Sequence, residues 1–95
     1  MTDYKLSARA DNDFDHILQY TYDTFGPFQA VKYAEGLEKC FEIIASNPYI
    51  GPENELYPKF RSFPHGKHII YYEIEADNIL IVHIVHASMH PNNHF

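Results

Sequence analysis

The sequence predicts an α+β fold in which an N-terminal edge strand and an antiparallel helical hairpin precede three antiparallel strands. Three observations lead to this class. Apolar residues recur at helical spacing from Ser7 to Asn47, period-two alternation replaces this spacing after residue 56, and Gly or Pro residues mark the boundaries. The element order is therefore β-α-α-β-β-β, with the hairpin packed on one face of the sheet. At 95 residues the chain is expected to form one domain.

The first predicted elements are a short strand at residues 4–7 and the helix after it. Ser7 can cap this helix because its side chain can accept a hydrogen bond from an N–H of the first turn. Five apolar residues then follow one helical stripe: Phe14, Ile17, Leu18, Tyr22 and Phe25. Four acidic residues are expected to stay largely in solvent: Asp11, Asp13, Asp15 and Asp23.

A second helix is predicted after Gly26-Pro27, since this pair ends one helix and starts another. Its apolar stripe consists of Ala30, Ala34, Leu37, Phe41 and Ile44, with Tyr33 and Cys40 beside it. Asn47-Pro48 stops the helix. The connection is short, so the two helices should lie antiparallel.

Three strands are predicted in the last third of the chain. They cover residues 57–63, 67–75 and 79–86, with turns at Pro64-His65-Gly66 and Ala76-Asp77-Asn78. The last strand is nearly continuous Ile, Leu and Val, which is typical of a central strand covered on both faces.

The charge distribution limits the classes of partner. The net charge of −6 disfavours broad electrostatic binding of nucleic acid, and all of it comes from residues 1–55. The later residues have a net charge of zero and six of the seven histidines. The acidic helix faces are interpreted as solvated surface rather than as an interaction site. No apolar run is long enough to cross a membrane and the first residues lack the basic-then-apolar pattern of a signal peptide, so the cytoplasm is expected.

No metal site, cofactor or reactive thiol is predicted. Cys40 is the only cysteine, and its place beside an apolar stripe indicates a buried thiol. His83 and His86 have opposite parity on one strand, so they could not share a metal while that strand stays regular. His86, His90 and His94 are spaced by four, but Pro91 disfavours a helix there.

Several segments, taken in order, resemble a known family. Tyr4-Lys5-Leu6-Ser7 with Arg9-Ala10 looks like its opening strand and helix start, and Phe25-Gly26 like its hairpin turn. The loop Asn47-Pro48-Tyr49-Ile50-Gly51 and the strands around Phe60-Arg61-Ser62-Phe63-Pro64 and Gly66-Lys67-His68 with Ile69-Ile70-Tyr71-Tyr72 continue the likeness. The ending His86-Ala87-Ser88-Met89-His90-Pro91 is similar to that of the ParE branch. The chain therefore resembles the RelE/ParE toxin superfamily, and most closely its ParE branch.

This resemblance implies the toxin of a type II toxin-antitoxin module, which acts on DNA gyrase by binding and without catalysis. A cognate antitoxin would neutralise it, and the chain alone would be poorly soluble or dimeric. The surface expected to contact the target comprises the tail from Ser88 to Phe95 and the neighbouring Arg61, His65 and His68. The residues singled out in it are Arg61, His65, His68, Ser88, Met89 and His90. The groove expected to hold the antitoxin is aromatic: Tyr49, Tyr57, Phe60, Phe63, Tyr71 and Tyr72.

Alternatives stay open for Arg61 and for the mechanism. On a strand among apolar residues, Arg61 is more often paired with an acid such as Glu73 or Glu75 than free for a partner. A RelE-like ribosome-dependent mRNA endonuclease needs cations at the scissile phosphate, yet Ser88 stands where a second arginine is expected. A histidine route through His83, His86 or His90 is conceivable. An inactive relative that only binds the antitoxin is the third reading.

Overall fold

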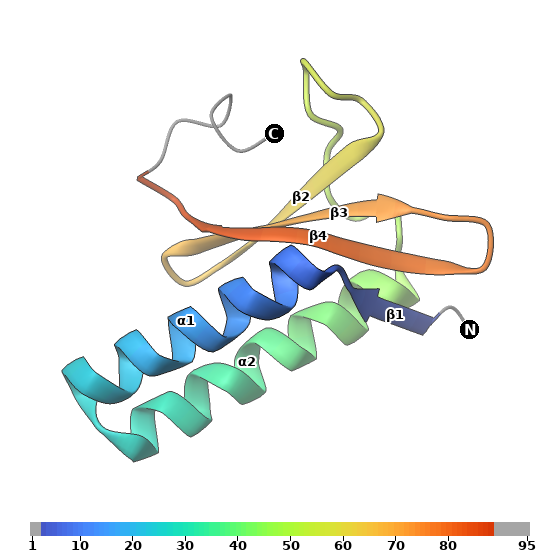
Figure 1. Ribbon diagram of the computed structural model, residues 1–95. Helices are drawn as coiled ribbons and strands as arrows, with labels where there is room; N and C mark the ends of the chain where they lie inside the picture. Colours follow the sequence, from blue (N-terminus) through green and yellow to red (C-terminus); the bar gives the residue numbers. More distant parts are fainter. Residues whose placement is uncertain (1–2, 89–95) are drawn as a thin grey trace.

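The computed structural model describes residues 3–88, which form a four-stranded sheet with a helical hairpin on one face (Figure 1). The elements are β1 (Asp3–Leu6), α1 (Ala8–Phe25), α2 (Pro27–Ser46), β2 (Phe60–His65), β3 (His68–Ile74) and β4 (Asn78–His86). The strand order is β1-β4-β3-β2, so the N-terminal strand lies at an edge as predicted. The predicted α+β class and element order are confirmed. Among the described helices, none is both long and apolar enough to cross a membrane.

The edge strand β1 makes the sheet mixed rather than wholly antiparallel. β1 pairs in parallel with β4, from Asp3 beside Asn78 to Leu6 beside Ile81, whereas the β2-β3 and β3-β4 pairs are antiparallel. Parallel neighbours cannot be joined by a tight turn. Here the two helices, β2 and β3 all lie between them in the chain, and this long connection allows the parallel pairing.

The helix boundaries follow the predicted capping residues. The Ser7 hydroxyl accepts the Ala10 N–H at 3.0 Å at the start of α1. Gly26 separates the helices with a φ of 92°, a left-handed value that favours glycine, and Pro27 is the first residue of α2. The N–H of Asn47 closes α2 by donating to Ile43 O and Ile44 O.

The core lies between α2 and the sheet. Leu37, Phe41 and Ile44 of α2 are fully buried against a layer of strand residues: Ile70, Tyr72, Ile79 and Ile81. The predicted apolar stripe of α2 is confirmed, with Ala34 half-buried. Cys40 is a buried thiol, as predicted, and burial raises its pKa.

The predicted apolar stripe of α1 is correct only in its first half. Phe14 and Ile17 pack against the core, but Tyr22 and Phe25 are 53% and 68% exposed. The hairpin turn extends beyond the end of the sheet, so no strand lies there to cover these rings (Figure 1). An apolar surface is therefore left exposed at the turn end of the hairpin.

The strand boundaries differ from the predicted ones mainly at β2. Tyr57 precedes the strand in a turn closed by the Phe60 N–H and Tyr57 O at 2.9 Å. Pro64 and His65, predicted as a turn, belong to β2, which tolerates a proline because it is an edge strand. The turn is formed by Gly66 and Lys67 instead.

Candidate functional site

Three histidines gather where β2 and β3 meet and where β4 ends; we call His65, His68 and His86 the histidine cluster. The rings of His68 and His86 lie edge to face, with centroids 5.5 Å apart. Tyr33 of α2 reaches them from the hairpin, because its hydroxyl lies 2.6 Å from His68 Nδ1 and 3.2 Å from His65 O. The cluster thus joins the second helix to the sheet.

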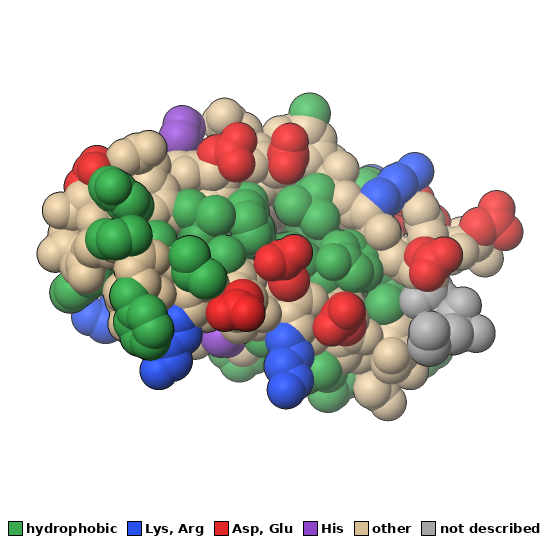
Figure 2. Space-filling model, turned by 90° about the horizontal axis from the view of Figure 1, so that it is seen from below, with side chains coloured by type: hydrophobic (Ala, Val, Ile, Leu, Met, Phe, Trp, Pro, Cys, Tyr) green, Lys and Arg blue, Asp and Glu red, His purple; other side chains and the backbone are tan. Residues whose placement is uncertain are grey.

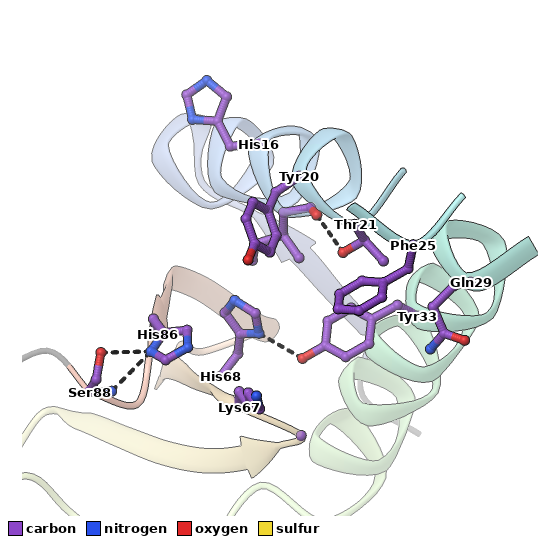
Figure 3. A pocket seen from close by; sticks show the side chains of 12 residues that line it. His16, Tyr20, Thr21, Phe25, Gln29, Tyr33, Lys67, His68, His86 and Ser88 are labelled. Atoms are coloured by element: carbon purple, nitrogen blue, oxygen red, sulfur yellow. Dashed lines mark hydrogen bonds between the residues drawn. The ribbon is translucent and has the colours of Figure 1, made fainter. Parts of the chain in front are cut away.

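Beside the histidine cluster lies an open cleft of about 690 Å³ between the hairpin and the sheet. Figure 3 shows Tyr20 and Phe25 of α1 on one side of the cleft, with His68 and His86 on the other and Tyr33 at one end. The remaining lining residues are His16, Ile17, Thr21, Gln29, Gly66, Lys67 and Ser88. Aromatic walls with a few polar groups suit a partly apolar ligand or a segment of a protein partner.

The hydrogen bonds of His86 fix the place of its proton. The Ser88 N–H donates to His86 Nδ1 at 3.1 Å, and the Ser88 hydroxyl lies 2.8 Å from the same nitrogen. Nδ1 must carry a lone pair to accept, so the neutral ring has its proton on Nε2. This pair holds the chain at Ser88, directly before the residues expected to contact a target.

A positive charge on His68 is unfavourable within the histidine cluster. Burial lowers the pKa of His68, and its neighbours His86 and His65 lower it further because imidazolium ions repel each other. Burial also raises the pKa of Tyr33, so its hydroxyl stays protonated. The His68 imidazole and the Tyr33 hydroxyl are therefore both uncharged at pH 7.

We expect the free energy of unfolding to fall as the pH drops below about 6.5, in part because of His68. The unfolded state binds the proton at the ordinary histidine pKa, whereas the folded state binds it only at a lower pH, so acid favours unfolding. A His68→Gln variant keeps an amide that can bond Tyr33 and does not titrate. Urea unfolding at pH 7.5 and 5.5 should show a smaller decrease for this variant than for the wild type. Equal decreases would contradict a neutral His68.

Arg61 serves the loop after α2 rather than an open surface. Its guanidinium donates to Gly51 O at 2.7 Å, lies 3.7 Å from Glu53, and covers the Tyr49 ring at 4.9 Å. Of the two roles left open for Arg61, these contacts match the structural one, but the acidic partner is Glu53 and neither Glu73 nor Glu75. Glu53 is the partner because its backbone forms an isolated antiparallel β-bridge with Arg61, which brings the loop next to β2. Arg61 is thus separated from His65 and His68 in its contacts.

The predicted aromatic groove does not form as one surface. Tyr71 and Tyr72 are 3% and 0% exposed, so neither lines an exposed groove. Tyr72 faces the helices, and its hydroxyl bonds the loop at Gly51 and Pro48. Phe63 packs against the core and Phe60 is half-buried. Tyr49 and Tyr57 keep exposed rings, while Met89 and His90 lie outside the described residues.

His83 and His86 have opposite parity on a regular part of β4, as predicted, because the β3-β4 register shifts only before His83, between the Tyr71–His83 and Tyr72–Ile81 pairs. His83 is buried with its Nδ1 against the Asp13 carboxylate. His86 instead contacts Ser88 and His68. Among residues 3–88, no three His, Cys, Asp or Glu side chains are grouped to hold a metal ion.

Two residues of these sites were not singled out from the sequence as functional. Tyr33 was placed only beside a core stripe, and Asp13 was expected in solvent, yet its carboxylate accepts the Ile84 N–H at 3.0 Å. Helical spacing shows which face of a helix is apolar, but it cannot show which strand edge passes that face. The one available signal for Tyr33 was that a side chain with a polar hydroxyl lies next to the apolar stripe of α2.

Comparisons with known proteins identify relatives over nearly the whole chain. Residues 4–91 match the family described as ParE toxin of type II toxin-antitoxin system, parDE. The chain is 34% identical over 95 residues to Toxin ParE1 of Caulobacter vibrioides, covering 99% of this chain and 98% of that protein. It is 31% identical over 88 residues to Toxin ParE1 of Mycobacterium tuberculosis, covering 90% of each.

Solved structures share the fold. One chain of a structure titled Chromosomal ParDE TA system from P. aeruginosa superposes with a TM-score of 0.78 at 20% identity, covering 90% of this chain and 96% of that one. The Helicobacter pylori protein HP0894 gives a TM-score of 0.52 at 14% identity, covering 93% and 97%. At these identities the likeness concerns the fold alone.

Proposed function

The chain belongs to the ParE toxin family of type II toxin-antitoxin systems, and from this membership we propose that it inhibits DNA gyrase by protein-protein binding, without catalysis. A cognate antitoxin would neutralise it. The target-binding surface in this proposal is the segment from Ser88 to Phe95, with His65 and His68 beside its start. His86 anchors that segment through Ser88.

The observation that carries the proposal against a nuclease is the role of Arg61. Cleavage of RNA needs cationic side chains free to hold the scissile phosphate. The Arg61 guanidinium instead bonds Gly51 O, pairs with Glu53 and covers Tyr49. Lys59 lies over the Phe60 ring at 5.0 Å. These contacts support a binding surface rather than a phosphate site on β2.

The open cleft is the better candidate for the antitoxin than the aromatic set taken from the sequence. Its walls include Tyr20 and Phe25, which are 65% and 68% exposed. Covering these rings would remove apolar surface from water, at about 25 cal/mol per Å². This exposed surface also supports the proposal that the chain is dimeric or poorly soluble alone.

Induced expression in a bacterial host tests the proposed target. We expect growth arrest with filamentous cells and a DNA-damage response, and purified chain should inhibit gyrase supercoiling. A truncation that ends at Ala87 should lose this inhibition, whereas Lys59→Ala, in the turn before β2, should retain it. Arrest with cleaved mRNA would show a nuclease instead, and normal growth would show an inactive relative.

Co-expression tests the antitoxin separately from the target. The product of the adjacent reading frame should restore growth and should co-purify with the chain. Tyr20→Ser and Phe25→Ser together should weaken that complex, since they remove the aromatic wall of the cleft. Unchanged binding by the double variant would place the antitoxin elsewhere.

A further inference from the structure

The cleft beside the histidine cluster differs in charge from the chain as a whole. The sequence has 13 acidic residues against seven Lys and Arg, yet none of the described residues that line the cleft is acidic. Its basic lining residues are Lys67 and three histidines: His16, His68 and His86. A cleft lined by charges of one sign concentrates ligands of the other sign, so this cleft favours an anion.

Lys67 supplies a full positive charge at the cleft. It is exposed in the turn between β2 and β3. Within residues 3–88 the salt bridges use other basic side chains, which are those of Lys5, Arg61 and His83. The ammonium group of Lys67 therefore has no acidic partner in the described part of the chain, and an anion in the cleft could take that place.

His86 provides a hydrogen-bond donor near Lys67. The bonds from Ser88 occupy Nδ1 of His86, so the donor that the neutral ring can offer is its Nε2–H. The Ala87 N–H donates to Lys67 O at 2.7 Å, which holds the end of β4 beside the turn that carries Lys67. An ammonium group and an imidazole N–H side by side suit the oxygens of a phosphate group.

The opposite wall of the cleft is aromatic. Tyr20 and Phe25 face the histidines from α1, with Tyr33 at one end (Figure 3). Tyr20 and Phe25 are mostly exposed, so their rings are accessible to a ligand. Nucleobases stack on aromatic side chains of this kind. A ligand that fills both parts of the cleft therefore has a flat aromatic group and an anionic group.

We propose that the cleft binds a purine nucleoside monophosphate, with its base against Tyr20 and Phe25 and its phosphate at Lys67 and His86. The cleft volume of about 690 Å³ lies within the range of about 300–1,000 Å³ that is typical of small-molecule sites. A purine is the larger of the two base types, so it covers more of the exposed aromatic wall. The nucleotide would compete with an antitoxin segment for this cleft.

The charge of the helical hairpin disfavours a longer nucleic acid as the ligand. Figure 2 shows the hairpin side of the molecule, where acidic side chains are spread over the surface. The exposed acids of α1 include Asp11, Asp15 and Asp23. The further phosphates of a strand would pass near this surface and be repelled. A mononucleotide contacts the cleft alone, where the described lining residues include no acid.

Equilibrium dialysis of radiolabelled adenosine monophosphate (AMP) against the purified chain provides the test, and it needs only dilute protein. Unlabelled AMP should displace the label, whereas adenosine and inorganic phosphate should each be at least about tenfold less effective, because each uses only one part of the cleft. Absence of saturable AMP binding, or equal displacement by inorganic phosphate, would overturn the proposal. Stronger displacement by a single-stranded oligonucleotide would also overturn it. Neither gyrase nor antitoxin takes part, so failure here leaves those proposals standing.

Two pairs of matched variants locate the bound nucleotide. Lys67→Gln and Lys59→Gln change the net charge equally, but Lys59 does not line the cleft. Tyr20→Leu and Tyr22→Leu each remove a ring from α1, and of the two only Tyr20 lines the cleft. All four side chains are exposed, so the variants should fold. We expect about fivefold to tenfold weaker AMP binding for Lys67→Gln and Tyr20→Leu, and less than about a twofold change for the controls. Equal effects within either pair would contradict binding in the cleft.

Discussion

Replacing Gly51 with alanine is expected to lower the free energy of unfolding by about 3 kcal/mol or more. A Cβ at this position would lie 2.0 Å from Ser62 O and 2.9 Å from Ser62 C, which are backbone atoms of β2. The loop cannot simply move away, because the Gly51 N–H donates to the Tyr72 hydroxyl at 3.0 Å and Gly51 O accepts from Arg61. Urea denaturation of both proteins measures the difference.

Gly26→Ala is the matched control for this prediction. Gly26 has a left-handed φ of 92°, but a Cβ there would have no neighbour within 4 Å. The alanine variant should therefore lose only about 1–2 kcal/mol from backbone strain. Gly51 presents the reverse case, since its φ is not left-handed and its neighbours are too close. If Gly51→Ala were no more destabilising than Gly26→Ala, the result would contradict the close packing of Gly51 against the backbone of β2.

The same loop shows why the sequence predicted elements better than contacts. Pro48 and Gly51 indicated a loop, and Arg61 on the next strand indicated a buried pair. Which acid would pair with Arg61 depended on how the loop returns across the sheet, and local pattern contains no information on this. The Tyr72 hydroxyl and the Arg61 guanidinium hold that return path.

The candidate site shows a similar limit. The sequence placed His65, His68 and Ser88 in one group, and the structure brings them close to Tyr33 and His86. It also grouped Arg61 with them, as part of the target surface that the resemblance implies. In the structure Arg61 lies near the loop end of β2 and His65 at the other end, four residues further along the strand. Arg61 is therefore separated from His65 by its position along the strand, rather than by the face of the sheet on which it lies.

The hairpin length explains why the stripe of α1 was only half right. Periodicity predicted one apolar face through Phe25, and that face exists. The sheet ends before the helical hairpin does (Figure 1), so Phe25 in the last turn of α1 lines the cleft instead of the core. An amphipathic stripe shows that a face prefers to be covered, but it does not show how far the sheet extends along that face.

Replacing Asp13 with alanine is expected to cost about 2–3 kcal/mol of unfolding free energy, because α1 protects an edge of β4 through this residue. β1 pairs with β4 only as far as Ile81. Beyond that point α1 and its N-cap residue supply the partners. The Ser7 hydroxyl donates to Val82 O at 2.8 Å, and the Asp13 carboxylate accepts the buried Ile84 N–H at 3.0 Å and contacts His83. Alanine leaves that N–H without its acceptor.

Asp15→Ala and Asp13→Asn provide the controls for the edge of β4. Asp15 is exposed on the same helix, so its replacement should change stability by less than about 0.5 kcal/mol. Asparagine retains an acceptor oxygen for the Ile84 N–H and should lose about half as much as alanine. Hydrogen exchange should also quicken at Ile84 in Asp13→Ala, because the open edge exposes that amide. Equal stability of the two alanine variants would show that this edge of β4 needs no protection from α1.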